Sequence, residues 1–371
     1  MIRLKELKKY DYLIVGSGLF GSVFARQATD VGKRCLVLEK RNHIGGNCYS
    51  EEIENIHVCK YGGHIFHTNN DKIWNYVNRF AEFRQYHHFV RVSYKGKIYS
   101  FPINLMTLQQ LWSVKTPEDA IDKLNEVKEN IENPDNLEEW VLSQVGKEIY
   151  ETFVKGYTQK QWGKDPKELP SFIIKRLPIR LTYENGYFSD KYQGFPENGY
   201  TELFVNLLKG IDVKLNVDYF GEKEYWDSLA SKIIFTGKID QYYNFEFGKL
   251  DYRTLIHKNE IADGDFQGCA TVNYTDGDVP YTRIIEHKHF QPHKNNNKTI
   301  ITTEYSKKYK RGDVPFYPIN DESNNKKYEQ YKQLADSESK VMFGGRLAEY
   351  KYYDMHQVVG SALRKADIWL N

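Results

Sequence analysis

Near its N-terminus the chain has a short apolar run at residues 11–15 that ends in glycines, a pattern typical of a buried parallel strand. An amphipathic stretch over 19–32 predicts a helix, and an apolar run at 34–40 predicts a second strand. Strand, helix and strand in this order form a βαβ unit. Later apolar runs at 212–217 and 232–237 are expected to join the same sheet.

The rest of the chain separates into a helical part and a part with strand-like alternation. Residues 104–175 carry helical periodicity. One helix is expected to begin at Thr116, and another to begin at Asn136 and end near Gly146. Alternation over 250–305 predicts antiparallel strands.

Turn residues predict a hairpin and several loops. Strand-like runs on both sides of residues 95–96 predict a hairpin. The Gly- and His-rich segments within 41–68 and the aromatic segment 180–201 are expected to be irregular. An apolar run at 341–345 predicts a strand, and 355–368 predicts a helix.

Composition and charge exclude several functional classes. The 371 residues include 52 Lys and Arg against 50 Asp and Glu, and this balance gives no basis for nucleic-acid binding. No apolar stretch approaches the roughly 18 residues of a membrane span, and no signal-peptide pattern precedes the first strand. Four cysteines without Cys-x-x-Cys spacing suggest reduced thiols, so we expect a cytoplasmic protein.

The sequence GSGLFG at 16–21 matches the G-x-G-x-x-G dinucleotide-binding motif in its required context, between a strand and a helix. Gly16 permits a tight turn, Gly18 lets backbone approach a pyrophosphate, and Gly21 allows close helix packing. Glu39 ends the second strand, where an acid accepts from a ribose hydroxyl. The alternative is a glycine turn in an unrelated α/β protein.

Two further segments favour FAD over NAD. The segment RNHIGGN at 41–47 resembles the extension that lies along FAD in glutathione-reductase-like flavoproteins, and Gly344-Gly345-Arg346 with Asp354 precedes a helix, as in that superfamily. A helix N-terminus beside the flavin would stabilise negative charge on the reduced ring. No second strand–GxGxxG–helix unit is present, so a dedicated NAD(P)H domain is not expected.

With these segments placed, the chain resembles bacterial UDP-galactopyranose mutases over nearly its whole length. The resemblance is carried by YDYLIVGSGLFGSV, LEKRNHIGGN, YGGHIFHT, KGYTQKQWG, FIIKRLPIRLTY, VPYTRIIEHKHF, FYPIN and GGRLAEYKYYDMHQV. It implies an α/β fold: a Rossmann-like FAD-binding domain, an inserted helical domain and an antiparallel β-sheet domain. The expected bounds are 1–80, 208–240 and 325–371 for the FAD domain, 102–175 for the helical domain, and 81–101, 176–207 and 241–324 for the sheet and substrate cleft.

The resemblance also implies an unusual use of flavin. N5 of reduced FAD attacks the anomeric carbon of UDP-galactose, UDP leaves, and the sugar of the adduct opens and recloses in the other ring form. The reaction is redox-neutral but needs an external reductant to activate the flavin. The family is commonly homodimeric and serves the synthesis of cell-surface polysaccharides.

Residue roles carry over from the matching motifs. Arg176 and Arg283 are expected to bind the diphosphate, whereas a lone arginine is more often a solvated surface charge. The expected catalytic residues are Arg176, Arg283, Tyr317, Tyr352 and Asp354. The expected substrate-binding residues are Phe153, Tyr157, Trp162, Arg176, Tyr187, Asn273, Arg283, Tyr317, Tyr352 and Cys59. The expected cofactor-binding residues are Gly16, Gly18, Leu19, Phe20, Gly21, Glu39, Lys40, Arg41, Gly46, Asn47, His64, Ile65, Arg346, Asp354 and Met355.

Some of these residues have simpler interpretations. Phe153 and Tyr157 are at i, i+4 spacing and could pack in a helical core instead of facing a uracil ring. His64 and His67 have a spacing that invites a metal site, but other ligand candidates are not clustered nearby and no metal is expected. A structural role is preferred for His287, and His289 stays open.

Departures from the family pattern in two regions put galactose itself in doubt. Cys59 stands where the family usually has histidine, and Gly63 stands at a position of proline or alanine. The segment Arg84-Gln85 also differs from the family. A mutase specific for another UDP- or dTDP-sugar is therefore an alternative. Others are a flavin oxidase or dehydrogenase of the amine-oxidase type, which would consume O₂ or NADPH, and a non-catalytic FAD- or nucleotide-binding protein.

Overall fold

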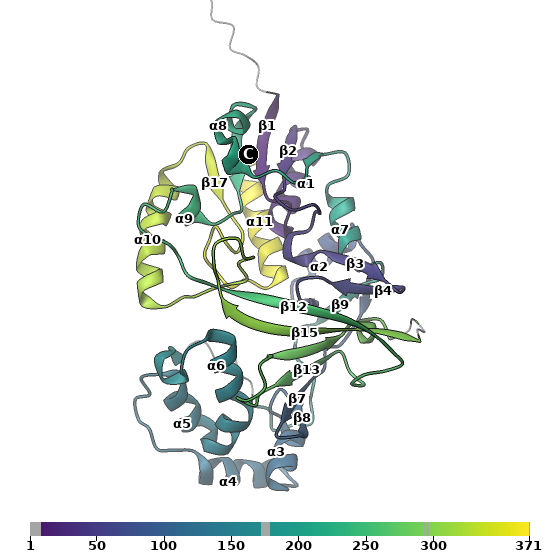
Figure 1. Cartoon of the computed structure of the whole chain (residues 1–371), viewed down its shortest axis with the longest axis vertical. Coiled ribbons are helices and arrows are strands. Elements are labelled where there is room, and N and C mark those ends of the chain that lie inside the picture. The colour runs from purple at the N-terminus through teal and green to yellow at the C-terminus, as the bar shows by residue number, and fades with distance from the viewer. Residues whose placement is uncertain (1–8, 172–178, 293, 295–296, 371) are drawn as a thin grey trace, which may run out of the picture.

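A five-stranded parallel sheet, with strand order β10-β2-β1-β11-β17, forms one end of the molecule (Figure 1). The computed structural model describes residues 9–171, 179–292, 294 and 297–370. The strands are β1 (Tyr10–Val15), β2 (Cys35–Leu38), β10 (Asp212–Lys214), β11 (Ala230–Phe235) and β17 (Val341–Phe343). All the expected parallel strands are therefore present and share one sheet.

Alternate residues of this sheet belong to different cores. Tyr12 and Ile14 of β1 pack into one hydrophobic cluster, while Leu13 between them packs into another. The first cluster is covered by α1 (Leu19–Asp30), α2 (Asp71–Asn78), α7 (Gly199–Leu207) and α11 (Met355–Leu370). The second is covered by α8 (Lys223–Ser228), α9 (Ile239–Tyr242) and α10 (Glu322–Ser337). Helices on both faces explain the continuous apolar runs of these strands.

A seven-stranded sheet, with order β16-β12-β15-β14-β13-β7-β8, crosses the middle of the molecule, and its long strands β12 and β15 form an extended antiparallel pair (Figure 1). The strands are β7 (Val90–Tyr94), β8 (Lys97–Phe101), β12 (Tyr252–Asp263), β13 (Thr271–Tyr274), β14 (Arg283–Glu286), β15 (Lys298–Lys308) and β16 (Tyr317–Pro318). Among the strand pairs described for this sheet, β13–β7 alone is parallel. The hairpin expected at residues 95–96 is formed by β7 and β8.

Four helices pack beyond this sheet, at the end opposite the parallel sheet (Figure 1). They are α3 (Leu105–Trp112), α4 (Pro117–Val127), α5 (Leu137–Ile149) and α6 (Gly156–Trp162). Thr116 and Asn136 cap α4 and α5 as expected. The expected end of a helix at Gly146 is wrong in part. The backbone is non-helical there (φ 75°), but helical structure resumes and continues through a π-helical turn, Tyr150–Lys155, into α6.

Two small sheets were not expected from the sequence, and parts of them lie in the segments 60–68 and 180–201 that were expected to be irregular. They consist of β3 (Ser50–Ile53) with β4 (Ile56–Cys59), and of β5 (Phe66–Thr68), β9 (Tyr192–Pro196) and β6 (Phe83–Gln85). These strands are too short to show a periodicity in sequence. No helix within the described ranges is long and apolar enough to cross a membrane. Where the three expected domains begin and end stays a prediction.

Candidate functional site

The glycine-rich turn lies between the end of β1 and the start of α1. Gly16 has a φ of +107°, and a Cβ there would lie 2.1 Å from Thr236 Oγ1, so glycine is required on two grounds. Gly18 is the residue before the first turn of α1. Gly46 passes over it so closely that a Cβ on Gly46 would lie 3.0 Å from the Gly18 Cα. The turn therefore offers bare backbone and a helix N-terminus to a pyrophosphate.

Glu39 is fixed at the end of β2 by three hydrogen bonds. Its Oε2 accepts from the Ser17 backbone N–H (2.9 Å) and hydroxyl (2.7 Å), and its Oε1 accepts from the Arg41 backbone N–H (2.9 Å). The carboxylate is mostly buried but lines the same cavity as the glycine turn. It is in place to accept from a ribose hydroxyl with its remaining lone pairs.

A single cavity of about 1170 Å³ extends from this turn to the seven-stranded sheet. It exceeds the volume of a site for one drug-sized ligand, which is at most about 1000 Å³. All the expected cofactor residues line it, as do the expected substrate residues Phe153, Tyr157, Trp162, Tyr187, Asn273, Arg283, Tyr317 and Tyr352. Arg176 lies outside the described residues. The fold thus brings both sets to one cavity.

Arg283 is the cation on the sheet wall of the cavity. It lies on β14, opposite Asn273 on β13, and its Nη2 donates to Glu304 Oε2 at 2.8 Å. Burial raises the pKa of the Glu304 carboxyl, but the charge of Arg283 and the nearby His257 outweigh it and lower the pKa to about 2. An ionised Glu304 keeps Arg283 charged and oriented, which suits it to bind a diphosphate.

Aromatic residues line the same wall. The rings of Tyr317 and Tyr352 lie 5.3 Å apart, and the Arg346 guanidinium lies over both, at 5.7 and 4.8 Å from the ring centres. Burial raises the pKa of Tyr157 and Tyr317. Both phenols therefore stay protonated near neutral pH and can donate hydrogen bonds to anionic oxygens.

The residues expected beside the base come from the π-helical turn and α6. Phe153 is 4% exposed and packs edge-on against Tyr99, with ring centres 5.5 Å apart. Its packing supports the core interpretation, although part of the ring reaches the cavity. Tyr157 and Trp162 are less buried and line the cavity directly.

Five polar atoms on the cavity wall are buried without a hydrogen-bonding partner among the described residues. They are Arg41 Nη1, His88 Nδ1, Asn273 Oδ1, Arg283 Nε and Arg346 Nε. Buried polar groups are rarely left unpaired in native proteins, so such a cluster indicates a polar ligand. These five atoms extend along the cavity from Arg41, in the RNHIGGN segment, to Arg283 on β14. Together with the glycine cradle, it fits a dinucleotide cofactor and an anionic substrate.

His88 is a cavity residue that the sequence did not reveal. It lies just before β7, with its ring 5.7 Å from Tyr187 and 6.2 Å from Phe188. Burial, with smaller contributions from Arg283 and His67, lowers the pKa of His88 to about 3, so the ring is neutral near pH 7. No motif surrounds this residue, and its proximity to Arg283 arises only from the folded sheet.

The departures from the family pattern at residues 59 and 63 lie in different places, and Arg84 and Gln85 are exposed on β6, outside the cavity lining. Cys59 is 1% exposed in the core and does not line the cavity, and its backbone N–H lies 3.4 Å from His287 Nδ1. His287 also bonds Thr302 (2.7 Å), which supports its structural role. Gly63 does line the cavity, but a Cβ there would lie 2.9 Å from the Phe290 ring. Phe290 therefore occupies the space that the missing side chain leaves.

Among the described residues, two groups of side chains have ligand atoms close enough to hold a metal. The first is His67, Asp354 and His356, and the second is Asp265, Glu286 and His289. In the first group, His67 Nδ1 is paired with Asp190 (2.7 Å) and its ring stacks on Phe188. The group lies at the start of α11, where the cofactor residues Asp354 and Met355 line the cavity.

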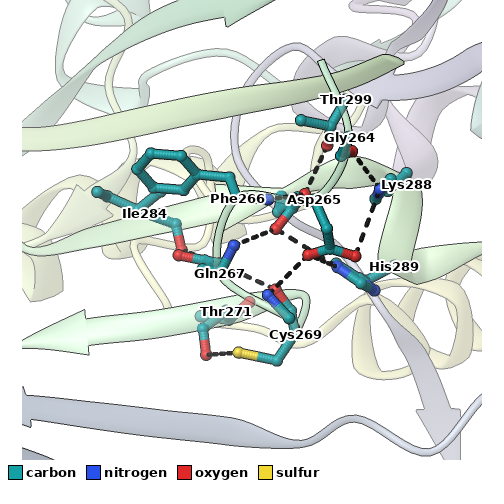
Figure 2. Close-up of polar contacts among 12 residues, drawn as sticks. Gly264, Asp265, Phe266, Gln267, Cys269, Thr271, Ile284, Lys288, His289 and Thr299 are labelled. Atoms are coloured by element: carbon teal, nitrogen blue, oxygen red, sulfur yellow. Dashed lines mark hydrogen bonds and ion pairs between the residues drawn. The ribbon is translucent and has the colours of Figure 1, made fainter. Parts of the chain in front are cut away.

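The second group belongs to a cluster of polar contacts that includes Asp265, Lys288 and His289 (Figure 2). The third member of the group, Glu286, is buried. Its carboxylate accepts hydrogen bonds from two backbone N–H groups of the loop 264–268 and from the Thr299 hydroxyl. Lys288 Nζ already lies 3.3 Å from the Asp265 carboxylate. His289 also contacts Asp265, at 3.1 Å. The acceptors are thus used by the protein itself, and His289 has a structural role.

Comparisons with known proteins agree with this geometry. A family model for UDP-galactopyranose mutase matches residues 152–352, and one for an NAD(P)-binding Rossmann-like domain matches residues 14–80. The dTDP-fucopyranose mutase of Escherichia coli is 39% identical over 370 residues, covering 96% of this chain and 98% of the relative. A probable UDP-galactopyranose mutase of Klebsiella pneumoniae is 40% identical over 365 residues, covering 97% and 94%.

Among solved structures, reduced UDP-galactopyranose mutase shares the fold, with a TM-score of 0.76 and 15% identity over 98% of this chain and 94% of that chain. The fold and the relatives together imply a flavin cofactor.

Proposed function

Since the chain belongs to the UDP-galactopyranose mutase family, we propose that it interconverts the pyranose and furanose forms of UDP-galactose or a close analogue, with no net oxidation. It is thus a flavin-dependent nucleotide-sugar mutase, an isomerase. The observation that carries the proposal is the shared cavity, in which the dinucleotide turn and Arg283 lie on the same continuous surface. A flavin oxidase would not need a fixed arginine for a diphosphate.

We assign the cofactor as FAD, which would be active when reduced and would supply the nucleophile for the reaction. Glu39 and the backbone around Gly18 would hold its ribose and pyrophosphate, and the start of α11 would face its ring. Arg283, with Arg176 from outside the described residues, would bind the diphosphate and stabilise it as a leaving group. The protonated hydroxyls of Tyr157 and Tyr317 would donate to the same anion.

The proposal covers both UDP- and dTDP-sugars, because the two relatives above, one named for UDP and one for dTDP, are about equally similar to the chain. An external reductant, a homodimeric assembly, a cytoplasmic location and a role in polysaccharide synthesis complete the proposal by analogy with the family.

The proposal is tested by incubating the dithionite-reduced protein with UDP-galactose, dTDP-fucose and related nucleotide pyranoses, and separating furanose products by chromatography. We expect conversion of at least one substrate with no stoichiometric consumption of O₂ or NADPH. The Arg283→Ala variant with normal flavin content serves as the matched control. Product formation that consumes O₂ or NADPH in proportion would instead identify an oxidase or dehydrogenase.

A further inference from the structure

His257 on β12 lies behind the diphosphate arginine, outside every motif singled out in the sequence. Its Nε2 lies 3.3 Å from Glu304 Oε2, the same oxygen that accepts from Arg283 Nη2 at 2.8 Å. The side chains of His257 and Glu304 are only 8% and 1% exposed. Donors from β12 and β14, the strands on either side of β15, therefore converge on one buried carboxylate oxygen.

The surroundings hold this arrangement tightly. An ionised carboxylate only accepts hydrogen bonds, so His257 must carry a proton on Nε2. The backbone passes close by at Gly62, where a Cβ would lie 3.3 Å from both Glu304 Oε2 and His257 Nε2. The Phe316 ring, which lines the cavity, packs against the imidazole at 5.6 Å between ring centres. His257 thus has little room to turn away from Glu304.

The net charge of this buried group depends on one proton. With neutral His257, the charges of Arg283 and Glu304 cancel; with a second proton on the ring, the group carries one positive charge. Burial lowers the pKa of His64 to about 4 and that of His287 to about 3, so these neighbours stay neutral above pH 5. Histidine is the side chain whose charge ordinarily changes near neutral pH, and His257 is the histidine whose ring contacts Glu304.

We infer that His257 is a positioning residue that controls, through Glu304, how much of the Arg283 charge is available to the substrate diphosphate. Protonation draws Glu304 toward His257 and leaves more positive charge facing the cavity. Nucleotide-sugar binding should therefore be tighter at low pH and weaker at high pH. The inference rests on the proposed role of Arg283 in binding the diphosphate.

The test measures the Kd of UDP-galactose and dTDP-fucose for the oxidised holoprotein between pH 5.5 and 8.5. Both ligands are diphosphate diesters whose charge does not change in this range, and the oxidised flavin prevents turnover. We expect the Kd of the wild-type protein to rise roughly threefold to tenfold with pH, since one charge acts across a partly screened distance. His257→Gln keeps a donor but cannot titrate, so its Kd should stay near the high-pH value throughout.

Three further variants make the outcome specific. His257→Asn is a second non-titrating variant should His257→Gln not fold. His87→Gln replaces an exposed histidine outside the cavity lining and should keep the wild-type pH dependence. If Arg283→Ala leaves Kd unchanged, the proposed diphosphate site itself is wrong. If Arg283→Ala weakens binding but a folded, non-titrating His257 variant retains the full pH dependence, only the role of His257 is overturned.

Discussion

Arg283 and Glu304 are paired directly across β14 and β15, and their side chains meet with Nη2 2.8 Å from Oε2. The carboxylate is 1% exposed, whereas the arginine lines the cavity. Glu304 holds one edge of the guanidinium, and Arg283 Nε has no partner among the described residues. A buried ion pair fixed on one side and unsatisfied on the other is suited to take a second anion from the cavity.

Replacing Arg283 by alanine should therefore lower kcat/KM by roughly tenfold to a thousandfold. The lost charge-assisted contact is worth about 1.5–4 kcal/mol in a desolvated site. Flavin content should be unchanged, because Arg283 does not belong to the dinucleotide turn. Steady-state kinetics of the reduced enzyme, with flavin absorbance as the control, measure both. Near-normal activity would remove Arg283 from the diphosphate site.

Glu304 should also give the protein a specific acid sensitivity. Its pKa is about 2 in the folded state, against 4.5 for a free glutamate. A lowered carboxyl pKa means stabilisation that is complete above about pH 4.5 and is lost as the pH falls toward 2. Unfolding midpoints of the wild type should thus decline over this range more steeply than those of Glu304→Gln, compared at matched flavin content. Parallel pH curves for the two proteins would contradict the lowered pKa of Glu304.

The redox state of the flavin should switch the activity on and off. The proposed attack on carbon requires the electron-rich reduced ring, and a second strand–GxGxxG–helix pattern is not found in the sequence. The purified protein should be yellow, inactive when oxidised and active after reduction with dithionite. Equal turnover in both states would rule out attack by N5. Activity that depends on continued consumption of the reductant would point to net redox chemistry instead.

Local motifs explain why much of the site could be predicted from sequence. The glycine turn, Glu39 and the start of α11 each depend on residues that are close in the chain, and their roles follow from backbone geometry. The helix α10 was not predicted, because only Asn324 and Tyr331 in its 16 residues are buried and no apolar stripe marks it. The surface helix therefore lacks the periodicity on which sequence analysis depends.

The contacts of His257 could not be predicted for a different reason. It lies 47 residues from Glu304 in sequence, and only the register of β12 against β15 brings the two together. His88 likewise reaches the cavity through the pairing of β7 with β13. Strand register over long sequence distances depends on the whole sheet, so a single sequence without a motif gives no signal for either histidine.

Cys59 should influence stability and not substrate choice. The sequence suggested that it shapes the sugar wall, but its side chain lies in the core. Cys59→His inserts a larger polar ring there, and overpacking of this kind costs about 1–3 kcal/mol. Thermal unfolding should shift to lower temperature, while the order of kcat/KM among nucleotide sugars stays the same. A changed order at unchanged stability would support the original hypothesis.

His88 is the residue that we expect to influence the choice of sugar. Its ring lines the cavity beside Tyr187, and its Nδ1 has no partner among the described residues. A polar ring in this position can hydrogen-bond a sugar hydroxyl, and sites built around such a bond discriminate against analogues that lack the hydroxyl.

His88→Phe keeps an aromatic ring and removes the polar atoms. It should reduce the preference between a hydroxylated sugar and its deoxy analogue by roughly tenfold to a hundredfold. The pKa of about 3 keeps the imidazole neutral, so the change in preference should be the same at pH 6 and pH 8.

The measurement is the ratio of kcat/KM for two sugars on the same nucleotide. UDP-galactose is compared with its deoxy analogue, and dTDP-fucose with its hydroxylated analogue. His87→Phe is the matched control, because it makes the same substitution at an exposed neighbour. If His88→Phe and His87→Phe leave the ratio equally unchanged, His88 only packs against the aromatic wall and the sugar is selected elsewhere.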